Sequence, residues 1–133
     1  MKNYGTIRGS FPVTAAGRDV RIVTTDFENH GVVAADDTTS GLGGSVVIST
    51  LMGFAIGFPP LAGYLPGVFT NTGTIRAGNG TFAAGSVRVR YYNGVATNVG
   101  TIIGGGPHFF GGAATVFATS IHNYGLVRGG DSA

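Results

Sequence analysis

A five-residue motif that recurs five times is the feature that most restricts what this chain can fold into. Each copy reads Asn, any residue, Gly, then Thr, Val or Leu, then Ile or Val, and the copies begin at Asn3, Asn29, Asn71, Asn98 and Asn123. Successive asparagines are 26, 42, 27 and 25 residues apart. Three of these steps agree, and the long step exceeds them by about 16 residues. The sequence therefore predicts a repeat of about 26 residues with one insertion.

Apolar residues precede the motif at fixed distances, which tests the repeat independently of the motif itself. The positions two, seven and nine residues before the asparagines are apolar, as shown by Val20, Ile22, Phe27, Phe69, Val89, Tyr91, Ala96, Ala114, Val116 and Ile121. When residues 51–66 are left out, Val46 and Ile48 fall at the same two outer positions before Asn71. A spacing of two is typical of β-strands that turn one face inward.

Composition agrees with a chain built of strands and turns. Glycine is abundant at 25 of 133 residues, 43% of residues are hydrophobic, and only 11% are charged. A disordered chain would be poor in apolar residues and rich in charge. We predict an all-β, single domain over residues 1–133: a parallel β-helix (β-solenoid) of about five coils, with coils stacked at the usual strand spacing so that equivalent residues align.

The motif residues are predicted to form a structural corner of this solenoid. Asparagine side chains bond neighbouring backbone groups, and asparagines stacked coil on coil can also bond one another. The glycine two residues later is predicted to take a positive φ, which other residues adopt only at a cost. The predicted corner consists of Asn3, Gly5, Asn29, Gly31, Asn71, Gly73, Asn98, Gly100, Asn123 and Gly125.

Residues 51–66 form an apolar insertion within the third coil and are the predicted site of partner binding. The segment holds eight large apolar side chains: Leu51, Met52, Phe54, Ile56, Phe58, Leu61, Tyr64 and Leu65. Soluble monomers rarely display such a patch, so contact with another subunit or partner is expected. Two alternatives stay open: the segment folds back over its own coil, or it inserts into a membrane.

The charged residues give little sign of catalysis. Asp26 and Glu28 would share one face of a strand, as a glycosidase requires, but residues 41–130 contain no Asp or Glu. The chain has no cysteine, and its three histidines lack metal-ligand spacing. We therefore expect no catalytic residue, no cofactor and no metal.

Several arginines recur at fixed distances from the motif. Arg8, Arg76 and Arg128 each lie five residues after a motif asparagine, whereas Arg21 and Arg90 each lie eight before one. Each group is expected to share one register and to face solvent or an acidic partner surface. The net charge of +2 gives no reason to expect a nucleic-acid partner.

Targeting signals are not expected. No apolar run follows Met1 and Lys2, so no secretory signal is visible. Glycines and prolines interrupt the apolar stretch 46–69, so no membrane-spanning helix is predicted.

The first copy, Asn3-Tyr4-Gly5-Thr6-Ile7, is followed by Arg8-Gly9. This pattern resembles the coils of bacterial adhesin and autotransporter passenger β-helices, and the β-helical segments of bacteriophage virion proteins. The short array without a secretory signal favours the virion proteins. The resemblance implies a structural or assembly protein: a phage capsid decoration or cement protein, or part of a tail or fibre. We expect it in the virion as a homotrimer that binds itself and other virion proteins through the insertion.

The alternative function is a carbohydrate-binding or glycan-processing β-helix, similar to an adhesin or tailspike. Such a protein needs a groove lined by aromatic rings and carboxylates, and Tyr91, Tyr92, Phe109 and Phe110 are the aromatic candidates. Their neighbourhood in the sequence lacks acids. The sequence therefore favours a structural protein that is not an enzyme, with a glycan as the alternative partner.

Overall fold

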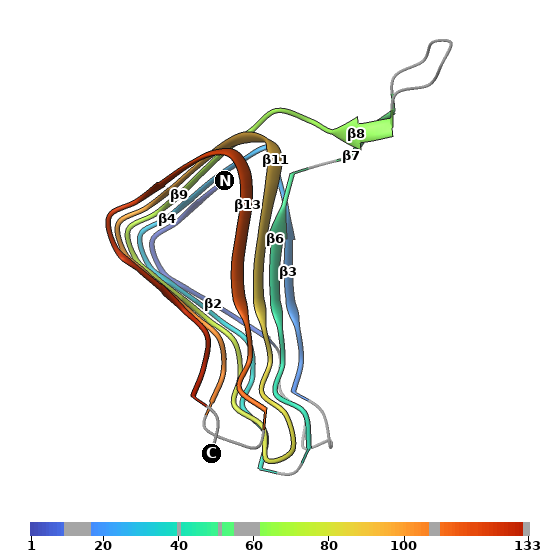
Figure 1. The fold of residues 1–133 in the computed structure, drawn as a ribbon, viewed down its shortest axis with the longest axis vertical. Helices are drawn as coiled ribbons and strands as arrows, with labels where there is room; N and C mark the ends of the chain where they lie inside the picture. Colours follow the sequence, from blue (N-terminus) through green and yellow to red (C-terminus); the bar gives the residue numbers. More distant parts are fainter. Residues whose placement is uncertain (10–16, 40, 51, 55–61, 107–109, 132–133) are drawn as a thin grey trace.

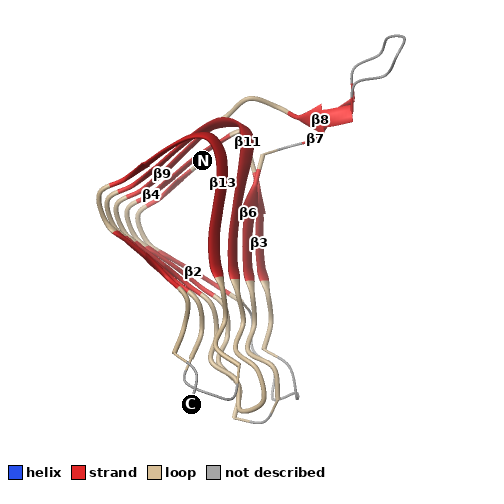
Figure 2. Cartoon of the chain, viewed as in Figure 1, coloured by secondary structure: helices blue, strands red, loops and turns tan. Residues whose placement is uncertain are grey.

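The computed structural model describes residues 1–9, 17–39, 41–50, 52–54, 62–106 and 110–131. Every regular element in these residues is a β-strand. The strands stack in parallel around a triangular cross-section, with loops extending from one corner (Figures 1 and 2). The predicted all-β parallel solenoid is confirmed, but it completes about four turns rather than five coils.

Three walls make up the solenoid, and all strand pairs within them are parallel. The first wall contains β3 (Val20–Val23), β6 (Val46–Ser49) and the first halves of β11 (Val87–Asn98) and β13 (Ala114–Asn123). The second wall contains β1 (Lys2–Asn3), β4 (Asp26–Asn29), β9 (Val68–Asn71) and the second halves of β11 and β13. The third wall contains β2 (Thr6–Arg8), β5 (Val32–Ala34), β10 (Thr74–Arg76), β12 (Thr101–Ile103) and β14 (Leu126–Arg128).

The core lies inside the triangle because inward apolar residues alternate with outward, more exposed residues along strands such as β3, β4 and β11. In β4, for example, Phe27 is 1% exposed while its neighbour Asp26 is exposed. Phe27 stacks on Phe69 of β9, and their ring centroids are 6.2 Å apart. Burial of one such side chain contributes about 1.5–3 kcal/mol. Only stacking encloses these side chains, because a single coil leaves its apolar face open.

The register of β11 differs from the prediction by two residues. Val89 was expected to align with Val20. Instead, Val87 pairs with Val46, and Val46 pairs with Val20. The cause is a bulge, in which residues 92–94 of β11 lie opposite the single residue 119 of β13. Because the shift is two residues, the inward face of the strand is preserved.

The insertion leaves the solenoid between β6 and β9. Two of its segments, β7 (Met52–Phe54) and β8 (Ala62–Tyr64), pair as an antiparallel hairpin. Figure 1 shows this hairpin beyond the corner that joins the first and second walls. Thr50 and Gly67, the residues on either side of the insertion, lie next to each other at this corner. A Cβ added to Gly67 would lie only 2.8 Å from the Thr50 methyl group.

Candidate functional site

The motif asparagines form a continuous hydrogen-bonded ladder at the corner between the second and third walls. Each Nδ2 donates to the Oδ1 of the asparagine in the next coil, over 2.8 Å from Asn3 to Asn29, from Asn29 to Asn71 and from Asn71 to Asn98, and 2.9 Å from Asn98 to Asn123. The predicted stacking of the corner asparagines is therefore present at all five copies of the motif.

Backbone carbonyls use the remaining donor capacity of the ladder. Asn71 Nδ2, for example, also lies 3.3 Å from the carbonyl oxygens of Gly73 and Thr101. Asn29 and Asn71 are fully buried. A buried amide is stable only when its donors and acceptors are paired, and here the stacked coils pair them. The ladder therefore has a structural role, and the side-chain amides of its central asparagines are not free to bind a ligand.

The corner glycines are required for a different reason from the predicted one. Among the described residues, Gly41 is the only residue with a positive φ, at 121°, so the corner glycines do not take the left-handed conformation. Instead, a Cβ on Gly100 would overlap the carbonyl oxygen of Gly73 in the preceding coil. Gly31, Gly73 and Gly125 face equivalent overlaps, whereas Gly5 has open space. Close approach of stacked backbones selects glycine here.

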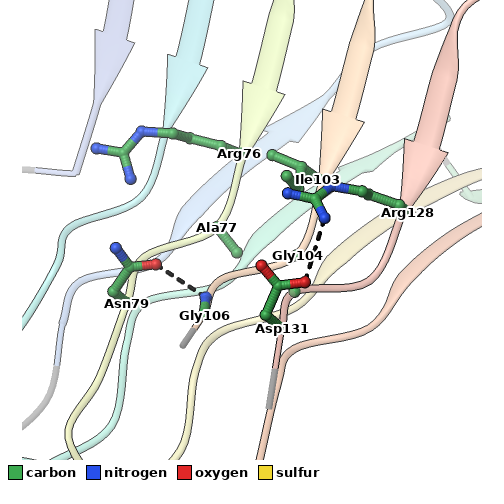
Figure 3. A pocket seen from close by; sticks show the side chains of 9 residues that line it. Arg76, Ala77, Asn79, Ile103, Gly104, Gly106, Arg128 and Asp131 are labelled. Atoms are coloured by element: carbon green, nitrogen blue, oxygen red, sulfur yellow. Dashed lines mark hydrogen bonds and ion pairs between the residues drawn. The ribbon is translucent and has the colours of Figure 1, made fainter. Parts of the chain in front are cut away.

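The predicted arginine row is formed on the third wall. Arg8, Arg76 and Arg128 lie in one register across β2, β10 and β14. Arg76 Nη1 binds Asp37 Oδ1 at 3.0 Å, and Arg128 Nη1 binds Asp131 Oδ1 at 3.2 Å. Figure 3 shows Arg76 and Arg128 among the residues that line a cleft of about 220 Å³, and three glycines, Gly104, Gly106 and Gly130, also line it.

The charge of Asp37 is stabilised by two residues that line this cleft, Arg76 and Asn79. Burial alone would raise its pKa, but bonds from the Arg76 guanidinium and the Asn79 backbone N–H hold the pKa below its ordinary value. Arg76 and Arg128 thus already have carboxylate partners within the chain, so this cleft offers an external anion little free positive charge.

The carboxylates considered for catalysis serve structural contacts. Asp26 and Glu28 do share the outward face of β4, but Asp26 Oδ1 accepts the Val68 backbone N–H at 3.1 Å. Glu28 binds Lys2 at 2.8 Å and also contacts His30. The bonds from Lys2 and His30 lower the pKa of Glu28, so it is poorly suited to act as a general acid.

The aromatic residues considered for a glycan groove are dispersed. Tyr91 is fully buried, its ring is 5.7 Å from that of Phe69, and its hydroxyl donates to the Thr24 carbonyl at 3.0 Å. Burial raises the pKa of this phenol. Tyr92 is exposed and packs on Phe117, with centroids 5.5 Å apart. Phe110 packs on Phe82, and Phe109 lies outside the described residues.

The structure describes only some of the predicted partner-binding residues. Leu51, Ile56, Phe58 and Leu61 lie outside the described residues. The backbones of Met52, Phe54 and Tyr64 lie in the β7–β8 hairpin, and Leu65 is 39% exposed. The hairpin stands off the solenoid walls (Figure 1).

The fold defines the class of this protein as a parallel β-solenoid, in which each coil packs on its neighbours. No protein-family model, curated protein or solved structure matches the chain. Within the described residues, no group of three His, Cys, Asp or Glu side chains is placed to hold a metal ion. The same residues include no helix of the length and hydropathy that a membrane span needs.

Proposed function

We propose that this chain is a structural assembly protein that is not an enzyme and binds other protein chains through its apolar insertion. The observation that carries the proposal is the position of the β7–β8 hairpin. The hairpin belongs to an insertion that holds eight large apolar residues in the sequence, and its two strands stand off the solenoid walls (Figure 1). An apolar segment held away from its own core gains most by burial against another protein.

The outermost coil adds a second apolar surface that an assembly would cover. Ile121 of β13 is 51% exposed, although it aligns with Ala96, Phe69 and Phe27, which are all buried. Leu126 of β14 is 46% exposed. A protein chain packed on this coil would bury these side chains and pair the strand edge.

The resemblance of the coils to virion β-helices supports a finer proposal. We infer that the partners are a second copy of the chain and other virion subunits, and that the protein serves as a capsid decoration or cement protein or as a tail or fibre part. A homotrimer located in the virion is part of this proposal. Closed symmetric assemblies are the commonest form of homo-oligomer.

Glycan binding remains the second candidate because of one observation. The exposed ring pair of Tyr92 and Phe117 offers an aromatic face on the outside of the solenoid. A sugar ring could stack on such a face. Glycan cleavage has less support, because Asp26 and Glu28 are engaged in structural contacts.

Deletion of residues 51–66 tests the proposal. Val23 and Asp26 are separated by two residues, and their register partners in the next coil are Ser49 and Val68. Joining Thr50 directly to Gly67 leaves the same number of residues, two, between Ser49 and Val68. The shortened coil therefore matches its neighbour in length. We expect light scattering to show fewer subunits per particle than in the wild-type protein. The β-sheet circular dichroism spectrum should be unchanged.

A full-length variant controls for the change in chain length. Substituting Phe54, Phe58 and Leu61 by serine keeps the segment but removes three of its large apolar side chains. This variant should lose the assembly as the deletion does. A wild-type protein that is monomeric, or an assembly that survives both changes, would refute the proposal.

A further inference from the structure

A second cleft lies on the outer face of the first wall. Its volume is about 450 Å³, and its lining consists of Arg21, Val23, Val47, Ser49, Thr50, Arg88 and Arg90. Arg21 of β3 aligns with Val47 of β6 and Arg88 of β11, while Val23 aligns with Ser49 and Arg90. Three guanidinium groups therefore extend from two adjacent rows of one sheet face.

This grouping differs from the sequence-based expectation. Arg21 and Arg90 were expected to share a register, but the two-residue shift of β11 places Arg88 in register with Arg21 instead. Arg90 consequently occupies the next outward position of the same strand. The bulge thus places Arg88 in register with Arg21 and leaves Arg90 on the same wall.

The positive charge of this cleft is not neutralised within the described part of the chain. No carboxylate is among the lining residues. The described residues form four ion pairs, and none of them involves Arg21, Arg88 or Arg90. On the third wall, by contrast, Arg76 and Arg128 each bind an aspartate.

Two buried polar atoms at the cleft also lack a partner. Arg90 Nε and Thr50 Oγ1 are buried, and neither makes a hydrogen bond to any described residue. Thr50 as a whole is only 1% exposed. Buried polar groups are normally paired, so an unpaired guanidinium donor and hydroxyl in one cleft are suited to a ligand.

We propose that this cleft binds a small oxyanion ligand that carries phosphate or sulfate groups. Guanidinium groups donate in a planar fork that matches the oxygens of these anions. Arg88 and Arg90 would hold one anionic group together with the Thr50 hydroxyl. Arg21 lies two strands from Arg88, or about 10 Å along the sheet, and would contact a second group of the same ligand.

Titration of the full-length protein with inorganic phosphate, sulfate and pyrophosphate, at constant ionic strength, tests this inference. Calorimetry or NMR should show saturable binding, with pyrophosphate bound more tightly than either single anion. Arg88→Gln and Arg90→Gln should each weaken binding about tenfold or more, because each removes charged hydrogen bonds. Arg8→Gln makes the same change of charge on the third wall and should alter affinity less than about twofold.

Two charge-preserving variants separate a built site from general attraction. Arg90→Lys lacks Nε and the fork, so it should weaken binding several-fold at unchanged net charge. Thr50→Val removes only the hydroxyl and should also weaken binding. Absence of saturable binding, an equal loss in Arg8→Gln, or full affinity in Arg90→Lys together with Thr50→Val would overturn the inference.

Discussion

At the scale of single residues, the motif is explained by two different contacts at one corner. The asparagine binds the asparagine of the next coil, and the glycine allows the next coil to approach. Asn29 and Asn71 have no exposed surface, so their amide groups depend on the stacked coils and on one carbonyl of their own coil for hydrogen bonds. The motif therefore encodes stacking rather than a ligand site.

Alanine substitution of the corner glycines distinguishes stacking from backbone strain. Gly100→Ala should destabilise the protein by more than about 2 kcal/mol, because the new Cβ overlaps the Gly73 carbonyl and the coils must separate. Gly5 occupies the same motif position in the first coil and has open space around its Cβ position. Gly5→Ala should change the free energy of unfolding by less than about 1 kcal/mol.

Urea denaturation of both variants provides the measurement. Equal destabilisation by Gly5→Ala and Gly100→Ala would show that backbone conformation selects glycine at the corner. That result would contradict selection by the close approach of stacked coils.

At the scale of the elements, the sequence predicted the strands better than their alignment. The spacing of Phe27, Phe69 and Ala96 before the asparagines identified a column that the structure confirms. Counting backward failed beyond Tyr92 because the bulge at residues 92–94 adds two residues to β11. A bulge depends on pairing with the neighbouring strand, so a single strand's residue pattern does not reveal it.

The cleft on the first wall escapes sequence-based prediction for the same reason. The alignment of Arg88 with Arg21 depends on the shift in β11, so the residue pattern alone does not distinguish Arg88. The unpaired state of Thr50 Oγ1 depends on three-dimensional packing and has no sequence signal. The Arg8, Arg76 and Arg128 row was predicted correctly, because no bulge separates these residues from the motif.

The loop after β5 is joined to β10 by a pH-dependent ion pair. The pKa of Asp37 is lower in the folded protein than its ordinary value. The ion pair therefore stabilises the fold fully at pH values above the ordinary, unfolded-state pKa. The stabilisation is lost as the pH falls through the folded-state pKa. Asp37 is 49% exposed, so solvent screening limits the contribution to about 0.2–1 kcal/mol.

Asp37→Asn should therefore lower the free energy of unfolding by that small amount at pH 7 and make no difference near pH 2. Urea denaturation at both pH values measures the effect. Asp131→Asn, which removes a more exposed partner of Arg128, is the control and should have a smaller effect. An Asp37→Asn loss of equal size at both pH values would show that the pair's charge is not responsible.

At the scale of the whole molecule, stability is transmitted from coil to coil. Each coil contacts only its neighbours, so the outermost coils of such an array open more readily than the central ones. The core is best covered in the central coils. On the third wall, Val33, Ile75 and Ile102 are fully buried, whereas Val127 of the last coil is only partly buried. Assembly partners would have their greatest effect on the exposed coil and on the hairpin.

Hydrogen exchange of the asparagine side-chain amides, followed by NMR, tests the stacked solenoid most directly. Protection should be strongest for Asn29 and Asn71, weaker for Asn98 and Asn3, and absent for Asn123, which is exposed and only accepts a ladder bond. This order follows from coils stacked in register with one continuous ladder. Rapid exchange of all five side-chain amides at similar rates would contradict the ladder, and with it the solenoid.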